Sequence, residues 1–402
     1  MSAVVTVFGL VPRYIGGSEN YGRELSLQLA SHGWKSVLCF LKQPPDDVLG
    51  YLDLPNTEIE VLENSDSPRP GLSTIKKLSQ ILRTHRANVL HLHLVGFVSP
   101  YPWLARACSV QRVFFTNHMS QQEGYLPRRA PLWKRRLVRV LNWPMSGVIC
   151  VSDYNYRCLT ALDLLPKERF KRVYNGIDFS RIADPTRRAK NFRARYGIPS
   201  GRTLIVQVCW MIRDKGVGDL LEAAQLVMVN NRDCHFAFVG EGADRAAFMK
   251  KAIELGLGDH VTWTGLIQDP FAEGVYDGAD IVCQPSRWEE AFGQVIAEAM
   301  ACNKPVIGTR VGGIPEVIDD GKAGFLVDRG DTAALAEKIL LLASDVNLRN
   351  QMGQAGRLLA ERKFDLKTIV SDLINLYGVV NLSTDAGDVI PTTMGDRSEA
   401  VG

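Results

Sequence analysis

The chain has 402 residues, of which 46% are hydrophobic and 23% charged, and its formal net charge is +3. These values are typical of a globular domain protein and exclude a disordered or fibrous chain. No apolar run approaches the roughly 20 residues of a membrane-spanning helix. Residues 2–10 lack the features of a signal peptide, so we expect them to contain the first core strand.

Apolar strands alternate with amphipathic helical patterns along the first half of the chain. The expected strands are Val4–Phe8, Lys35–Phe40, Ile59–Leu62, Val89–His93, Val113–Thr116, Val148–Val151 and Arg172–Tyr174. Helical periodicity falls between several of them, at Gly22–Ser31, Ser73–Thr84 and Asp153–Leu164. Continuous apolar strands separated by helices predict a parallel sheet that is covered on both faces.

The second half repeats this alternation. Its expected strands are Leu204–Val208, His235–Val239, Val261–Thr264, Ile281–Gln284, Pro305–Gly308 and Phe325–Val327. Its expected helices are Gly218–Val229, Ala243–Leu255, Gly293–Ala301 and Thr332–Ala343. A single sheet that held the strands of both halves would be unusually wide. We therefore predict an α/β protein with two doubly wound, Rossmann-like domains that face a cleft.

The domain boundary is predicted near Ile182–Pro199, where Asp184-Pro185-Thr186-Arg187-Arg188 leads into a charged segment with Pro and Gly. This gives an N-terminal domain at 1–182 and a C-terminal domain at 183–365. Residues 366–382 are expected to form a last helix that packs back toward the first domain. Residues 383–402 are polar and aperiodic, which predicts a disordered tail.

Charge indicates the kind of partner that the protein meets, and cysteine content indicates its cellular compartment. Residues 1–182 hold 23 Lys and Arg against 14 Asp and Glu, a balance of +9, which suggests that this half faces something anionic. The eight cysteines contain no C-x-x-C pair, and most lie in apolar runs. Buried single thiols are typical of a reducing compartment, so we expect a cytoplasmic protein without a metal site.

The most informative segment is Pro285–Ala301, which follows an apolar strand and sets Glu290 and Glu298 eight positions apart around a helix start. Unpaired amides near residues 293–295 could donate to a diphosphate. The Glu298 carboxylate could accept hydrogen bonds from a ribose diol, with Glu290 at the other end of the ligand. This combination suits a nucleotide sugar. The alternative is that one glutamate complements the helix dipole and the other faces solvent.

The sequence around the two glutamates favours the ligand-binding interpretation. With one extra residue between Ser286 and Glu290, Pro285–Ala301 resembles the motif P-S-x-x-E-x-F-G-x-x-x-x-E-A-M-A of the family 4 glycosyltransferases, which are retaining enzymes with the GT-B fold. The resemblance extends over nearly the whole chain. It includes Lys215-Gly216, Val239-Gly240-Glu241-Gly242, Gly312-Gly313-Ile314-Pro315-Glu316 and Gly324-Phe325-Leu326-Val327.

The resemblance implies that residues 1–182 form an acceptor-binding domain and residues 183–365 a nucleotide-sugar-binding domain. It also implies a role for each matching residue. Glu290 would bind a hydroxyl of the donor sugar, Glu298 the nucleotide ribose, and Lys215 would neutralise the leaving diphosphate. His118 matches a position where family members place a histidine against the donor sugar and acceptor. The other implied donor-binding residues are Gly16, Gly17, Gly265, Leu266, Ile267, Phe292, Gly293, Gln294 and Val295.

One position departs from the family pattern. The family usually has Arg five residues before the lysine, where this chain has Trp210, and tryptophan cannot supply the donors of a guanidinium. Our hypothesis is that Arg213 reaches the phosphates instead. No D-x-D pair that would hold a metal–diphosphate complex is present, so we expect metal-independent transfer with no cofactor. His91 and His93, which end a strand, are expected to be structural.

Residues 124–152 are basic and contain no acidic side chain. The patch consists of Arg128, Arg129, Trp133, Lys134, Arg135, Arg136 and Arg139. Basic residues mixed with Trp and Leu suit a helix that lies on an anionic membrane surface. The alternative is a surface helix whose apolar side packs on its own sheet. No nucleic-acid-binding module accompanies the patch, so we expect no nucleic-acid partner.

These features together predict a retaining glycosyltransferase that moves a sugar from a nucleotide-diphosphate sugar to an acceptor hydroxyl. The acceptor would be a glycan or a lipid-linked intermediate in polysaccharide or glycolipid biosynthesis. In the mechanism debated for the family, the acceptor attacks on the face from which the diphosphate leaves, and a diphosphate oxygen takes the proton. The alternatives are a non-catalytic nucleotide-sugar binder, supported by Trp210, and a nucleotide-sugar epimerase of the same fold.

Overall fold

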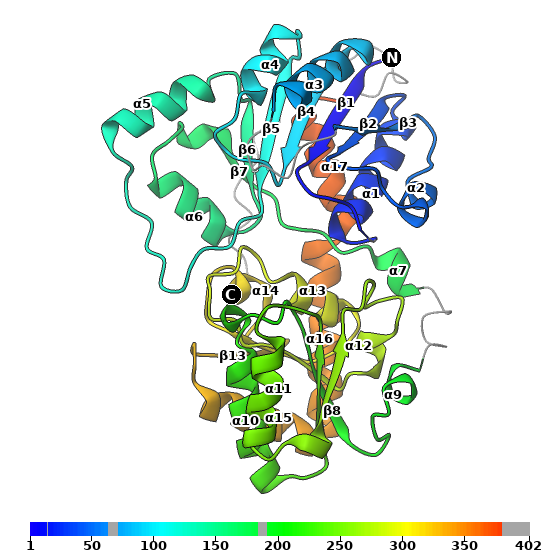
Figure 1. Cartoon of the computed structure of the whole chain (residues 1–402), viewed down its shortest axis with the longest axis vertical. Helices are drawn as coiled ribbons and strands as arrows, with labels where there is room; N and C mark the ends of the chain where they lie inside the picture. The colour runs from blue at the N-terminus through cyan, green and yellow to red at the C-terminus, as the bar shows by residue number, and fades with distance from the viewer. Residues whose placement is uncertain (14, 63–70, 184–190, 380–402) are drawn as a thin grey trace, which may run out of the picture.

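Two parallel sheets, one in each lobe, organise the computed structural model (Figure 1). The structure describes residues 1–13, 15–62, 71–183 and 191–379. The predicted linker at 184–188 and the predicted tail at 383–402 lie outside these residues.

The N-terminal lobe has a seven-stranded sheet in the order β3-β2-β1-β4-β5-β6-β7. Its strands are β1 (Ala3–Phe8), β2 (Lys35–Phe40), β3 (Thr57–Val61), β4 (Ala87–His93), β5 (Arg112–Asn117), β6 (Gly147–Cys150) and β7 (Phe170–Arg172). Its helices are α1 (Gly17–Ser31), α2 (Asp46–Tyr51), α3 (Leu72–Thr84), α4 (Tyr101–Ala107), α5 (Leu132–Leu141), α6 (Asp153–Ala161) and α7 (Phe179–Ala183). All six residues of β1 are buried, because this strand pairs with β2 and β4 and is covered on both faces.

The C-terminal lobe has a six-stranded sheet in the order β10-β9-β8-β11-β12-β13. Its strands are β8 (Thr203–Val208), β9 (Cys234–Val239), β10 (Val261–Gly265), β11 (Ile281–Gln284), β12 (Val306–Thr309) and β13 (Gly324–Val327). Its helices are α9 (Phe192–Arg195), α10 (Val217–Asn230), α11 (Arg245–Glu254), α12 (Val275–Gly278), α13 (Gln294–Ala301), α14 (Ile314–Val317), α15 (Thr332–Ser344) and α16 (Val346–Phe364).

The two sheets share one topological feature that positions a binding site. The strand order reverses beside the first strand of each sheet, between β1 and β4 and between β8 and β11. Open parallel sheets bind ligands beyond the carboxyl ends of their strands at such a switch point. The prediction of two doubly wound domains is confirmed. One predicted strand, Arg172–Tyr174, was placed two residues too late, because β7 spans Phe170–Arg172.

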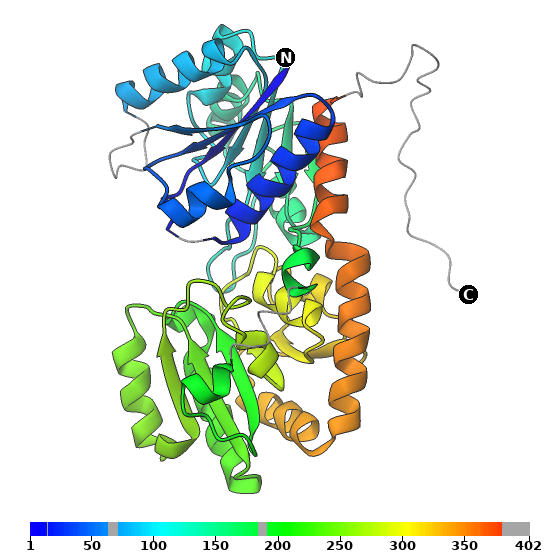
Figure 2. The same cartoon turned by 90° about the vertical axis from the view of Figure 1, so that its right-hand side faces the viewer.

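The last helices join the lobes along one side (Figure 2). Helix α16 ends at Phe364, and α17 (Leu366–Tyr377) follows after a single residue and packs against α1. The Ile177 amide donates to the Phe364 carbonyl at 2.7 Å, and the Leu366 amide donates to the Ile177 carbonyl at 3.1 Å. Leu373 of α17 joins the buried cluster that contains Leu25 of α1. The end of the described chain therefore completes the core of the N-terminal lobe.

Candidate active site

A cavity of about 400 Å³ lies between the two lobes, and we call it the interdomain cavity. The start of α1 contributes Gly16 and Gly17 to one wall. Lys215, Val295 and Glu298 from the C-terminal lobe contribute to the other wall. The cavity thus lies where the switch points of both sheets predict a ligand.

Glu290 is a buried carboxylate on the loop between β11 and α13, and it contacts two residues that line this cavity, Lys215 and Gln284. Its Oε1 accepts from Lys215 Nζ at 2.7 Å, Ser286 Oγ at 2.6 Å and Gln284 Nε2 at 3.0 Å. Its Oε2 lies 3.4 Å from Ser120 Oγ of the N-terminal lobe. Burial alone would raise the pKa of Glu290, but Lys215 and these hydrogen bonds outweigh it and hold the pKa below its usual value.

Lys215 is fixed beside Glu290 by the glycine that follows it. Gly216 has φ +68°, and a Cβ there would lie 1.8 Å from the Pro285 carbonyl oxygen, so only glycine lets the two loops meet. The Lys215 ammonium also lies 4.3 Å from the centre of the Trp288 ring. The cation is therefore held in place before any ligand arrives.

Helix α13 presents its N-terminus beside this pair. Gly293, at the cap position, has φ +114° and no side chain with which to cap the first amides of the helix. Glu298, one turn further on, accepts from Tyr276 Oη at 2.5 Å and from Gln294 Nε2 at 3.2 Å. Burial raises the pKa of Glu298 above its usual value. Amide donors and a half-buried carboxylate thus lie on one helix.

The lobes are held together by hydrogen bonds next to Glu290. The backbones of Gln121 and Glu289 exchange two hydrogen bonds, each of 2.9 Å. The carboxylate of Glu316 accepts from the amides of Asp153 and Tyr154 at the start of α6, both at 2.6 Å. A carboxylate at a helix N-terminus is favourable because it meets unpaired amides and the positive end of the dipole.

The Gly-Gly-Ile-Pro-Glu segment connects this contact to Glu290. A Cβ on Gly312 would lie 2.1 Å from the Glu290 carbonyl oxygen, and the Gly313 amide donates to that oxygen at 2.8 Å. One short segment therefore supports the Glu290 backbone and carries Glu316 to the other lobe.

Two family models match the chain, one to each lobe. The model described as Glycosyltransferase Family 4 matches residues 15–181, and the model described as Glycosyl transferases group 1 matches residues 188–359. The chain is also 32% identical to the D-inositol 3-phosphate glycosyltransferase of an Arthrobacter species, over 77% of this chain and 73% of that protein. The chain belongs to the family 4 glycosyltransferases.

Other relatives agree with this assignment. The N-acetyl-alpha-D-glucosaminyl L-malate synthase of Bacillus anthracis is 28% identical and aligns with 90% of this chain and 94% of its own length. A glycosyltransferase structure from Rickettsia africae matches with a TM-score of 0.76 at 20% identity, over 95% of this chain and 99% of its own. Anabaena Alr3699/HepE in complex with UDP and glucose matches with a TM-score of 0.74 at 18% identity, over 94% and 99% of the two chains. These structures share the GT-B fold with this glycosyltransferase.

The implied donor-binding residues of this glycosyltransferase do not all face the interdomain cavity. Leu266 and Ile267 line it, next to Gly265 with φ +73°. Phe292 is buried, with its ring 5.2 Å from that of Phe364, so its side chain belongs to the core. Only the Phe292 backbone is then available for the implied role.

Lys215 lines the interdomain cavity as expected, but the arginine that lines it is not the expected one. Arg213 is exposed and does not line the cavity, and its amide donates to Asp244 Oδ2 at 2.8 Å, so the structure gives the Arg213 hypothesis no support. Arg181 of α7 does line the cavity, where it pairs with Asp269. Trp210 lines it too and is 68% exposed. Sequence reasoning missed Arg181 because only the folding of the chain between the lobes brings α7 to this site.

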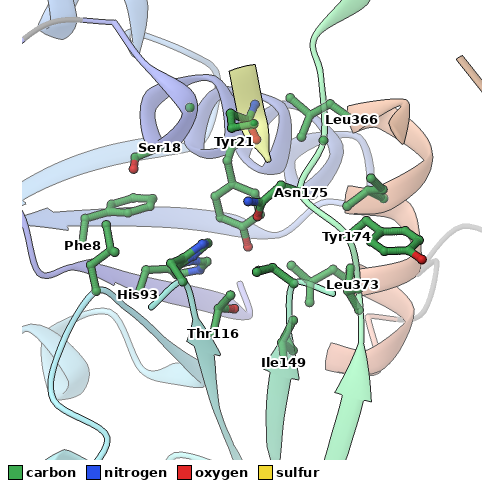
Figure 3. A pocket seen from close by; sticks show the side chains of 18 residues that line it. Phe8, Ser18, Tyr21, His93, Thr116, Ile149, Tyr174, Asn175, Leu366 and Leu373 are labelled. Atoms are coloured by element: carbon green, nitrogen blue, oxygen red, sulfur yellow. The ribbon is translucent and has the colours of Figure 1, made fainter. Parts of the chain in front are cut away.

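Beside it lies a second cavity, of about 260 Å³, which we call the N-lobe cavity (Figure 3). His93 and His118 line it, and they belong to a buried chain of histidines. His118 Nε2 lies 3.2 Å from His93 Nδ1, and His93 Nε2 lies 3.2 Å from His91 Nδ1. Burial lowers the pKa of His118 to about 4 and that of His91 to about 3, which keeps these rings neutral. His93 therefore borders a cavity, although its strand-end position alone predicted a structural role.

Helix α5 carries much of the basic patch and turns its apolar side chains outward. Trp133 and Trp143 are 68% and 69% exposed, and Leu137 and Val140 are exposed as well. Arg129, Arg135 and Arg139 gather around Asp163. Arg128, Lys134 and Arg136 are exposed, with no ion pair among the described residues. Trp133, Leu137 and Val140 of α5 are therefore exposed, whereas Val138 of the same helix is buried.

Proposed function

We propose that this glycosyltransferase moves a sugar from a nucleotide-diphosphate sugar to an acceptor hydroxyl with retention of configuration, and without a metal ion or other cofactor. The observation that carries the proposal is the Lys215–Glu290 pair beside the uncapped N-terminus of α13. The complex of Anabaena Alr3699/HepE with UDP and glucose supports this class of donor. The names of the sequence relatives support a place in the biosynthesis of glycans, glycolipids or small glycosides.

The geometry suggests how the charges would act. Glu290 Oε1 already has three donors, whereas Oε2 lies 3.4 Å from Ser120 Oγ, so Oε2 is the oxygen that would accept from a sugar hydroxyl. Lys215 and the amides of α13 would stabilise the negative charge that grows on the leaving diphosphate. Glu298 would exchange its bond to Gln294 for the ribose hydroxyls.

The reaction then needs few proton transfers. The acceptor oxygen would attack the anomeric carbon of the donor sugar while the bond between that carbon and the diphosphate oxygen breaks on the same face. The released diphosphate oxygen would take the proton of the acceptor hydroxyl. His118 would position the acceptor as a neutral hydrogen-bonding group rather than as a cation. The protein supplies orientation and electrostatic stabilisation.

Glu290→Gln tests this proposal, because it keeps the shape of the side chain and removes its charge. We expect transfer and donor hydrolysis to fall by about 10²–10³-fold, while the nucleoside diphosphate that binds the unmodified protein (UDP, GDP or ADP) still raises the melting temperature. Glu337→Gln, on the exposed face of α15, is the matched control. Unchanged turnover in Glu290→Gln would contradict the assigned role.

The same assay separates the rival functions. If the unmodified protein binds nucleotide but turns over no nucleotide sugar, with or without acceptors, it is a binder. If it interconverts donor sugars without any acceptor, it is an epimerase.

We further propose that the protein works in the cytoplasm and docks on an anionic membrane through α5. Its eight cysteines are free, which suits a reducing compartment. No helix in the described part of the chain is long and apolar enough to cross a bilayer. The outward Trp133, Leu137 and Val140 would enter the lipid interface, and the unpaired basic residues would meet anionic headgroups.

Flotation with phosphatidylcholine vesicles, with and without phosphatidylglycerol, tests the docking. We expect binding only to the anionic vesicles, lost in Trp133→Glu and kept in Leu358→Glu, a change at an exposed residue of α16. Absence of binding to anionic vesicles at low salt would refute the docking proposal.

A further inference from the structure

The donor that we propose is assigned to the interdomain cavity, which leaves the N-lobe cavity without an assigned ligand. This cavity lies among α1, the ends of β1, β4, β5 and β6, and the C-terminal helix α17 (Figure 3). Leu366, Ile369 and Leu373 from α17 line the cavity. Leu366 and Leu373 lie across it from Phe8 (Figure 3). Residues more than 350 positions apart in the sequence thus enclose one space.

The lining of the N-lobe cavity is uncharged. All of its lining residues belong to the described chain, and none is Lys, Arg, Asp or Glu. Ile149, Val151 and Val173 add to the apolar surface. The polar groups that line it are neutral, and they include the side chains of Ser18, Asn175 and Gln294 and the histidines described above.

The N-lobe cavity adjoins the interdomain cavity. Gly17 lines both of them. Gln294, the first residue of α13, lines the N-lobe cavity, whereas Val295 and Glu298 of the same helix line the interdomain cavity. A molecule in the N-lobe cavity would therefore lie next to the helix end that we assign to the diphosphate.

We propose that the N-lobe cavity holds the acceptor, and that this acceptor presents a neutral, apolar ring or chain to it rather than an anionic group. The inference rests on the proposed function, because it assumes that a donor occupies the interdomain cavity. A carboxylate or phosphate placed here would lose its water without meeting a cation, which is costly. An apolar group would instead replace water against Phe8, Ile149 and Leu373. The substrates named for two relatives, L-malate and D-inositol 3-phosphate, are anions and do not fit this lining.

Binding of simple probes tests the acceptor class. Phenyl β-D-glucopyranoside, which is neutral and aromatic, is compared with L-malate and myo-inositol 1-phosphate by calorimetry on protein saturated with UDP, GDP or ADP, whichever binds. Ile369→Trp fills the cavity from a half-buried position on α17, and Leu358→Trp is the matched change on the exposed face of α16.

We expect the phenyl glucoside to bind and both anions to fail. Its affinity should fall by about tenfold or more in Ile369→Trp and stay within about twofold in Leu358→Trp. Nucleotide affinity should be unchanged in both variants, which also shows that they fold. Binding of an anion in preference to the phenyl glucoside, or phenyl glucoside affinity unaffected by Ile369→Trp, would overturn the acceptor class alone. If no nucleoside diphosphate bound the unmodified protein, the proposed function would fail, and the inference with it.

Discussion

The two cavities of this glycosyltransferase lie side by side and differ in charge. The interdomain cavity is lined by the Lys215 and Arg181 cations and by the carboxylate of Glu298, and the buried carboxylate of Glu290 is bonded to Lys215. Among the described residues, none that lines the N-lobe cavity is charged. On the proposed function, charge is thus fixed where the leaving group would develop it, while the neighbouring surface stays neutral.

The largest effect is expected when the cation beside Glu290 is removed. Lys215→Met should lower turnover by about 10²–10³-fold, because the leaving diphosphate loses its fixed positive charge. Steady-state kinetics with the donor found by nucleotide screening measures the effect. Lys250→Met, on the exposed surface of α11, is the control. A loss of less than about threefold would show that the charge difference between the cavities does not serve catalysis.

A second test weakens the contact between the two lobes that Glu316 makes with the start of α6. Glu316→Gln replaces a carboxylate that accepts from two α6 amides with a group that carries its own N–H donors. We expect the free energy of unfolding to fall by about 1–3 kcal/mol. Urea denaturation monitored by fluorescence measures this loss, and Glu337→Gln serves as the control. A variant as stable as the unmodified chain would show that this contact is dispensable.

Acid should lower the stability of the N-terminal lobe, which contains the neutral histidines. Burial lowers the pKa of His91 to about 3, below its ordinary value of 6.5. The unfolded chain then binds this proton more readily, so the stability from neutral His91 is complete above pH 6.5 and is lost as the pH falls from 6.5 toward 3. Between pH 7 and pH 5 this residue should account for a loss of about 2 kcal/mol. Denaturation at both pH values should show a smaller loss in His91→Gln; equal losses would contradict the assignment.

The smallest effect concerns the unusual tryptophan of the interdomain cavity. Trp210→Arg restores the residue that the family usually has, and it adds a cation at an exposed position of the wall. We expect the affinity for nucleoside diphosphate to rise by about three- to tenfold. Isothermal calorimetry measures the change, with Val229→Arg on α10 as a control for added surface charge. Unchanged affinity would mean that the cavity already holds enough positive charge.

The sequence predicted the strands of both lobes well, because buried parallel strands read as continuous apolar runs. It also predicted the family, through Glu290, Glu298 and the segment around them. It did not predict that Ser120 and Ser286 contact Glu290, since hydroxyl residues carry no distinctive local pattern. The exposed position of Arg213 could not be foreseen either, because a loop sequence does not show which way its side chains point.

The sequence by itself therefore determined the architecture and the family, because periodicity and the spacing of two glutamates are local properties of the chain. The tertiary structure decided which cation faces the interdomain cavity, that Glu316 joins the lobes, and that α17 closes an uncharged cavity in the opposite lobe. The physical reason is that these features depend on contacts between residues far apart in the chain. Their energies come from burial and from hydrogen bonds that exist only once both lobes have folded and met.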